Sequence, residues 1–84
     1  MKKKVLITGG AGYIGSMLAT QLINEGYFVT VIDLMKYEKN SLNHLFFYNN
    51  FKLIQNDVRN LDILKKEVIK SDVIIPLAAL VGAP

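Results

Sequence analysis

Short apolar runs alternate with amphipathic stretches along this 84-residue chain. Runs such as Val5-Leu6-Ile7, which is continuous, apolar and partly β-branched, are typical of strands buried in a parallel sheet. They predict strands near residues 4–8, 28–32, 52–56 and 73–76. Apolar residues between the runs recur at helical spacing and predict helices near 12–25 and 60–70.

Each predicted helix carries one apolar face. In the first helix that face contains Ile14, Met17, Leu18, Leu22 and Ile23. Gly26 stands where a C-cap glycine is expected, because glycine adopts the left-handed conformation that ends many helices. The apolar face of the second helix contains Leu61, Ile63, Leu64, Val68 and Ile69, while Lys65, Lys66, Glu67 and Lys70 face water. A short helix over 41–48 is expected to turn Leu42, Leu45 and Phe46 inward.

The alternation of strands and helices also predicts a topology. Right-handed crossovers place the four strands in the order 3-2-1-4, the first half of a doubly wound sheet plus the strand across its switch point. The fold class is therefore α/β, a partial Rossmann fold with a parallel sheet and flanking helices. In a complete fold a fifth strand would cover the apolar edge of the fourth. We expect residues 1–84 to be the N-terminal part of a dinucleotide-binding domain, without its catalytic and substrate-binding parts.

A glycine-rich run, TGGAGYIG at residues 8–15, joins the first strand to the first helix. Gly9, Gly12 and Gly15 give the spacing G-x-x-G-x-x-G, and Gly10 opens an overlapping G-x-G-x-x-G. The first glycines let main-chain N–H groups approach a pyrophosphate where a Cβ would intrude, and Gly15 lets the helix pack closely on the strand. The positive end of the helix dipole also attracts phosphate. The run predicts a dinucleotide site; the alternative is an ordinary strand-to-helix turn.

Asp33 ends the second predicted strand, at the distance beyond the glycines where such sites carry an acid. Its carboxylate is expected to accept hydrogen bonds from the adenosine ribose and to repel a 2′-phosphate. This favours NAD over NADP, although the nearby Lys36 weakens the preference. The alternative for Asp33 is a solvated aspartate in a turn.

From Lys4 to Pro84 the chain resembles the N-terminal part of an extended short-chain dehydrogenase/reductase, the NAD-dependent epimerase/dehydratase family acting on nucleotide sugars. The resemblance implies that Tyr13 and Ile14 offer main-chain amides to the pyrophosphate. It implies that Asp57-Val58 holds the adenine and that Leu77-Ala78-Ala79 lets the cofactor lie against the backbone. Two alternatives stay open, since Asp57 could cap the helix near residue 60 and the alanines could simply admit a packed helix. The expected cofactor-binding residues are Gly9, Gly12, Tyr13, Ile14, Gly15, Asp33, Asp57, Val58, Leu77, Ala78 and Ala79.

Enzymes of the resembled family use a Tyr-x-x-x-Lys pair on a helix after the fourth strand. Tyr48 and Lys52 have that spacing, but they precede the third predicted strand, so we expect no catalytic residue in this chain. Pro76 also departs from the family, where a histidine often precedes the small residues. The leading hypothesis is the NAD-binding portion of a sugar-nucleotide epimerase or dehydratase, inactive by itself. The alternatives are a non-catalytic NAD(P)-sensing module and a Rossmann-like methyltransferase.

Composition narrows the remaining possibilities. The chain has no cysteine, which fits a reducing cytoplasm and leaves no thiolate nucleophile or metal ligand. Its net charge of +3 comes mostly from scattered lysines without interleaved aromatic residues, so no nucleic-acid partner is expected. The uncharged stretch over 73–84 is too short to span a membrane. The single histidine, His44, is expected at the surface rather than in a metal site, and the oligomeric state stays open.

Overall fold

The computed structural model describes residues 3–9, 13–33, 42–57 and 60–77. Within these residues a four-stranded parallel sheet has the order β3-β2-β1-β4, which confirms the predicted topology. The elements follow the predicted ranges to within one or two residues, except that among the described residues 42–48 only three form a helix. In chain order they are β1 (Lys4–Thr8), α1 (Tyr13–Asn24), β2 (Phe28–Asp33), the 3-10 helix η1 (Asn43–Leu45), β3 (Phe51–Gln55), α2 (Leu61–Lys70) and β4 (Val73–Pro76).

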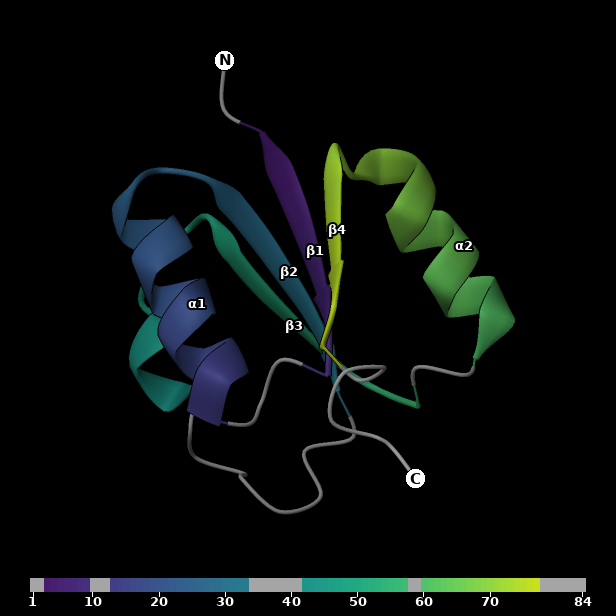
Figure 1. Ribbon diagram of the computed structural model, residues 1–84, viewed down its shortest axis with the longest axis horizontal. Helices are drawn as coiled ribbons and strands as arrows, with labels where there is room; N and C mark the ends of the chain where they lie inside the picture. Colours follow the sequence, from purple (N-terminus) through teal and green to yellow (C-terminus); the bar gives the residue numbers. More distant parts are fainter. Residues whose placement is uncertain (1–2, 10–12, 34–41, 58–59, 78–84) are drawn as a thin grey trace.

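The two α-helices cover opposite faces of the sheet (Figure 1). Parallel strands need crossover connections: α1 lies in the connection from β1 to β2, η1 in that from β2 to β3, and α2 in that from β3 to β4. The main core lies between the sheet and the layer formed by α1 and η1. It contains strand residues that alternate inward together with helix residues, namely Val5, Ile7, Ala19, Ile23, Val29, Val31, Leu42, Leu45 and Leu77.

A Schellman motif ends α1, as the position of Gly26 predicts. Gly26 has a φ of 91°, a left-handed conformation that disfavours residues with a Cβ. Its N–H donates to the carbonyl of Ile23 at 3.0 Å, and the N–H of Tyr27 donates to the carbonyl of Leu22 at 3.1 Å. The motif satisfies carbonyls at the end of the helix and turns the chain directly into β2.

The predicted apolar face of α1 is only partly correct. Ile23 is buried and Leu18 and Leu22 pack against the core, but Ile14 and Met17 are 63% and 55% exposed. The most deeply buried line of the helix instead runs through Gly15, Ala19 and Ile23. Small residues at the first two of these positions bring the helix close to the sheet, and this rotates Ile14 and Met17 toward solvent.

The predicted face of α2 is wrong at three positions. Leu61 and Ile69 are exposed, and Glu67 is buried rather than facing water. At 3.6 residues per turn Glu67 lies in the middle of the arc formed by Ile63, Leu64 and Val68, which are all partly buried. The helix turns this arc toward the sheet, so the carboxylate lies inside. At η1 and its flanking residues, Leu42 and Leu45 are buried as predicted, but Phe46 is exposed, and its ring centroid lies 5.6 Å from that of Phe51.

Candidate functional site

The candidate site is built at the carboxyl edge of the sheet, where the chain leaves β1. Thr8 is the last residue of β1 and is buried between Ile32 and Pro76 on the neighbouring strands. Gly9 follows with a φ of 76°, which a residue with a Cβ would adopt only at a cost in free energy. Its N–H donates to the carbonyl of Ile32 at 2.7 Å. The bend after β1 is therefore tied to the end of β2.

The first turn of α1 faces the same edge. The helix begins at Tyr13 and carries no acidic side chain in its first turn, so nothing there neutralises its positive end. The first N–H groups of a helix have no carbonyl partner within it, and they are the donors that bind phosphate in such sites. Gly15 is buried on the inner side of the helix. A side chain at this position would push α1 away from the sheet.

Two acids lie beside this bend, at the ends of β2 and β3. Asp33 is the last residue of β2, is half-buried, and its carbonyl accepts a hydrogen bond from Asn56 at 3.0 Å. Asp57 follows β3, is half-buried, and its N–H donates to Oδ1 of Asn56 at 2.7 Å. Asn56 thus links the segments that carry the two carboxylates.

The alternative that Asp57 caps the following helix does not match the structure at the N-cap itself. That position belongs to Asn60, whose Oδ1 accepts a hydrogen bond from the N–H of Ile63 at 3.3 Å. Asp57 contributes its main-chain carbonyl, which accepts from the N–H of Asn60 at 3.0 Å. Its side chain therefore does not serve as the N-cap of α2.

The fourth strand completes the edge. Pro76 is the last residue of β4 and pairs with Thr8, so its missing N–H lies at the strand end as expected. Leu77 follows, and its side chain is buried in the core cluster on the α1 side. Any contact of Leu77 with a ligand would then come from its main chain.

The structure thus brings together the described members of the predicted site. Across the edge, Asp57, Asp33, Gly9 and Leu77 follow the strand order 3-2-1-4, and α1 starts above β1. This is the topological switch point, where doubly wound sheets bind ligands. Four predicted site residues, Gly12, Val58, Ala78 and Ala79, lie outside the described residues, as do Gly10 and Lys36. The contacts of all these residues with a cofactor stay predictions.

Tyr48 and Lys52, which have the spacing of the catalytic pair, and the single histidine lie away from this edge. Tyr48 precedes β3, at the amino edge of the sheet, and Lys52 Nζ lies 3.4 Å from Glu67 Oε2. His44 is exposed, as predicted, and its Nε2 lies 2.7 Å from Thr20 Oγ1. Neither group reaches the glycine bend.

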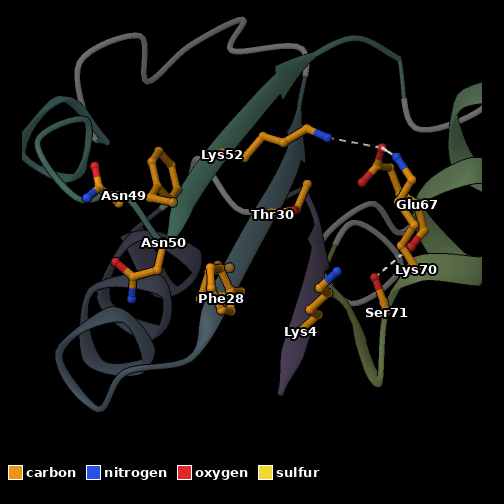
Figure 2. A pocket seen from close by; sticks show the side chains of 11 residues that line it. Lys4, Phe28, Thr30, Asn49, Asn50, Lys52, Glu67, Lys70 and Ser71 are labelled. Carbon is orange, nitrogen blue, oxygen red and sulfur yellow. Dashed lines mark hydrogen bonds and ion pairs between the residues drawn. The ribbon is translucent and has the colours of Figure 1, made fainter. Parts of the chain in front are cut away.

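Sequence reasoning missed a second group of polar residues at the amino edge. A cavity of about 320 Å³ opens there between β1, β2, β3 and α2 (Figure 2), and Glu67 lies between Lys52 and Lys70 at its wall. The available signal was the helical spacing of α2, which places Glu67 within the apolar arc despite its charge. Within the described part of the chain, no helix is long and apolar enough to cross a membrane.

Comparisons with known proteins agree with this architecture. UDP-N-acetyl-alpha-D-glucosaminuronate decarboxylase of Bacillus cytotoxicus is 39% identical over 98% of this chain and 25% of its own length. The dTDP-glucose 4,6-dehydratase of Bacillus anthracis, solved with NAD, superposes with a TM-score of 0.79 at 26% identity, over 90% of this chain and 26% of its own. The UDP-glucose 4-epimerase of Thermotoga maritima, solved with UDP-glucose, gives a TM-score of 0.73 at 28% identity, over 89% and 24%.

The chain spans about a quarter of the length of the relative with 39% identity, and a similar share of the two solved enzymes. The profile of the NAD dependent epimerase/dehydratase family matches residues 5–84. NAD is the cofactor that this description names, in agreement with the cofactor expected from the glycine run and Asp33. The match favours this family over the methyltransferase alternative. The chain belongs to the NAD-dependent epimerase/dehydratase family.

Proposed function

We propose that this chain is the NAD-binding part of an oxidoreductase that acts on nucleotide sugars. The observation that carries the proposal is the carboxyl edge of the sheet, where the Gly9 bend, the start of α1 and the two acids lie on neighbouring strands. Related enzymes were solved with NAD and with UDP-glucose, which supports both the cofactor and the substrate class.

The residues present fit a dinucleotide. Gly9 has a left-handed φ and Gly15 is buried against the sheet, so a Cβ at either position would disturb the approach of a pyrophosphate or of the helix. In the proposal, Gly12 also leaves room for the pyrophosphate, and the main-chain amides of Tyr13 and Ile14 donate to it.

In the proposal, the two acids contact different parts of the adenosine. Asp33 accepts hydrogen bonds from the ribose, and Asp57 with Val58 holds the adenine. The segment Leu77-Ala78-Ala79 lies along the cofactor through its backbone. When bound, NAD supplies the acceptor for a hydride from the sugar. The tyrosine and lysine of the family are not at the matching place in these residues, so we expect the chain by itself to bind NAD without converting a nucleotide sugar. We place it in the cytoplasm, to which its lack of cysteine is suited.

Calorimetric titration of the chain with NAD, NADP and S-adenosylmethionine tests the proposal. We expect NAD to bind most tightly, because the Asp33 carboxylate repels the 2′-phosphate of NADP. Asp33→Ala should weaken NAD binding by about 1.5 to 3 kcal/mol, since it removes charge-assisted hydrogen bonds to the ribose. The same variant should bring the NAD and NADP affinities closer together.

Glu25→Ala is the matched control, since it removes one exposed carboxylate at the far end of α1. It should leave both affinities unchanged. An Asp33→Ala variant with the parent's NAD affinity would remove this acid from the site. Tighter binding of S-adenosylmethionine than of NAD would overturn the proposed cofactor.

A further inference from the structure

The cavity at the amino edge of the sheet lies at the opposite end of the strands from the Gly9 bend. It opens on the α2 face, where Lys4 of β1 pairs with Phe28 of β2, and Thr30 of β2 pairs with Lys52 of β3. Figure 2 shows the Lys4 and Lys52 side chains pointing toward α2, which closes the opposite side. The lining residues are Lys4, Phe28, Val29, Thr30, Asn49, Asn50, Phe51, Lys52, Glu67, Lys70 and Ser71.

Positive charge dominates this lining. Three ammonium groups, of Lys4, Lys52 and Lys70, come from three different elements, and Glu67 is the one carboxylate among the lining residues. Asp72 lies next to the cavity, and its Oδ2 accepts a hydrogen bond from the main-chain N–H of Lys4 at 2.8 Å. The lysines therefore still outnumber the acids when this neighbour is included. An excess of ammonium groups around a small cavity attracts anions.

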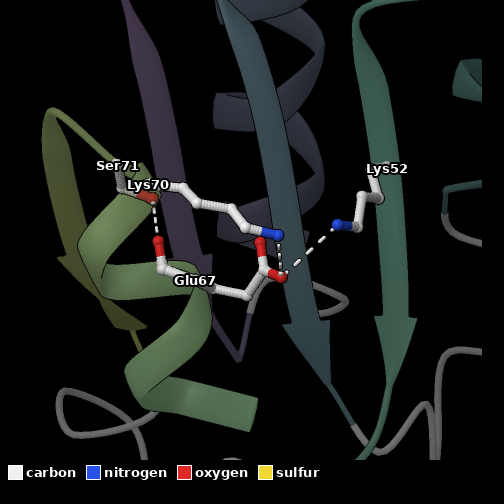
Figure 3. A network of polar contacts seen from close by, with 4 residues as sticks. All are labelled: Lys52, Glu67, Lys70 and Ser71. Carbon is white, nitrogen blue, oxygen red and sulfur yellow. Dashed lines mark hydrogen bonds and ion pairs between the residues drawn. The ribbon is translucent and has the colours of Figure 1, made fainter.

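Glu67 holds two of the ammonium groups in place (Figure 3). Its Oε2 lies 3.4 Å from Lys52 Nζ and 3.8 Å from Lys70 Nζ, and the residue is only 7% exposed. A buried carboxylate keeps its partners close, because losing them would leave an unpaired charge. The lysines are thus oriented before any ligand arrives, which lowers the entropy that binding must overcome.

The end of α2 does not cancel this attraction. Carbonyl groups at a helix C-terminus repel anions, but the carbonyl of Glu67 accepts a hydrogen bond from Ser71 Oγ at 2.6 Å. The N–H of Ser71 donates to the carbonyl of Val68 at 3.1 Å. Two of the terminal carbonyls are therefore already hydrogen-bonded where α2 meets the cavity.

The floor of the cavity offers an apolar contact as well. Phe28 is 45% exposed, although it begins a strand in which Val29, Val31 and Ile32 are buried. Thr30 adds a hydroxyl group from the same strand. The Asn50 side-chain amide donates to the main-chain carbonyl of Tyr27 at 2.8 Å, so it acts as part of the wall. A ligand that carries both an anion and a flat ring matches this combination.

We propose that this cavity, an open groove between the sheet and α2, binds a small phosphate monoester. The phosphate lies between Lys4, Lys52 and Lys70, and a ring lies against Phe28. A volume of about 320 Å³ falls in the range of small-molecule pockets. Three lysines and one accessible ring make too short a track for a nucleic-acid strand, which needs successive stacking platforms. The proposal does not depend on the NAD site, because the two lie at opposite edges of the sheet.

An NMR titration of the ¹⁵N-labelled chain with phenyl phosphate at low ionic strength tests this. We expect the largest shifts at the amides of Thr30, Asn50 and Ser71, and much smaller ones at Gly9 and Gly15. Inorganic phosphate should bind more weakly, because it has no ring to place on Phe28. Lys4→Gln, which keeps both pairs of Glu67, should weaken phenyl phosphate binding about threefold. Lys52→Gln combined with Lys70→Gln should weaken it at least about tenfold.

The matched control combines Lys65→Gln with Lys66→Gln, which removes two charges from exposed positions of the same helix outside the groove. It should leave the affinity within a factor of about two. An equal loss in this control would mean that only net charge matters and would overturn the site. Shifts confined to Gly9 and Gly15 would overturn it as well, while leaving the NAD proposal intact. If a single-stranded oligonucleotide bound and phenyl phosphate did not, the proposed small ligand would be wrong and a nucleic acid would be the ligand of this groove.

Discussion

The two faces of the sheet are built differently. On the α1 face, neighbouring strands present buried aliphatic side chains along their whole length, as Val5, Ile7, Val29 and Val31 show. On the α2 face only the carboxyl half is of this kind, through Leu6 and Ile32. The amino half carries the Phe28 ring together with polar and charged side chains, and these line the lysine-rich groove.

The two faces are therefore stabilised in different ways, one by the burial of apolar area and the other by a specific charge pairing. On the α1 face, the burial of aliphatic side chains away from water stabilises the folded state, whatever their exact neighbours. Glu67 on the α2 face is stable in its buried position only because two ammonium groups lie beside it. The stability of the α1 face therefore depends on the volume of its buried side chains. The stability of the α2 face depends on the charge partners of Glu67.

Ile7→Ala and Leu6→Ala compare the two faces directly, because the parent side chains are both fully buried neighbours on β1. We expect Ile7→Ala to lower the free energy of unfolding by about 4 kcal/mol, since it empties the centre of the larger cluster. Leu6→Ala should cost about 2 to 3 kcal/mol, because the groove beside it gives its neighbours room to close the gap. Urea unfolding followed by circular dichroism measures both values.

Ile74→Ala is the control for these substitutions, since it shortens a large aliphatic side chain of β4 that is already exposed. Its cost should stay below about 1 kcal/mol, because less apolar area is lost from the interior. A larger cost for Leu6→Ala than for Ile7→Ala would reverse the comparison.

The second test removes the charge partners of the α2 face. Lys52→Met combined with Lys70→Met leaves the Glu67 carboxylate buried without a cation, and we expect a loss of about 2 kcal/mol in unfolding free energy. The loss stays below that of a deeply buried pair because the lysine side chains are themselves 53% and 57% exposed. Adding Glu67→Leu to the double variant should restore most of this stability, since a leucine needs no partner. If the triple variant is no more stable than the double one, the charge of Glu67 is not the cause.

The same contrast explains what could be predicted from the sequence. The strands, their order and the end of α1 follow from local signals: β-branched runs, helical spacing and Gly26. The exposure of Ile14 does not, because the rotation of α1 depends on how closely Gly15 and Ala19 approach the sheet. The burial of Glu67 depends on Lys52, which lies on another element, so no local pattern shows the pair.

The candidate cofactor site was predictable for a related reason. Its described members are chain segments that leave consecutive strands, so the strand order alone brings Gly9, Asp33 and Asp57 to one edge. The groove has no such motif. Lys4, Lys52 and Lys70 stand far apart in the sequence, and only the packing of α2 on the sheet brings them to one cavity.

Gly26→Ala tests how far the α1 face depends on the local signal that ends its helix. The left-handed φ of 91° disfavours a Cβ, so we expect unfolding to become easier by about 1 to 2 kcal/mol. Gly26→Asn should cost less, because asparagine enters this conformation more readily than alanine. Thermal unfolding of both variants gives the comparison, and equal stability of the alanine variant and the parent would show that α1 does not need this ending.

Thr20→Val should have the smallest effect, because it changes a polar contact at the exposed rim of the α1 face. The Thr20 hydroxyl has one hydrogen, which it donates to the carbonyl of Ser16 at 2.7 Å. It must therefore accept the hydrogen bond from His44 Nε2, also at 2.7 Å, and this fixes the proton of the neutral imidazole on Nε2. Valine has nearly the same shape without the hydroxyl, so we expect a loss of about 0.5 kcal/mol in unfolding free energy.

A long-range ¹H–¹⁵N spectrum of the neutral imidazole reads the tautomer directly. In the parent, Nε2 should show the shift of a protonated nitrogen, and Thr20→Val should move that shift while leaving the amides of Val29 and Val31 in place. Because water replaces the lost partner at this rim, the cost should stay well below that of stripping Glu67 of its lysines, where water does not reach the carboxylate as easily. A proton found on Nδ1 in the parent would contradict the assignment, and a cost near 2 kcal/mol would mean that the rim of the α1 face, like the groove, depends on one specific polar pairing.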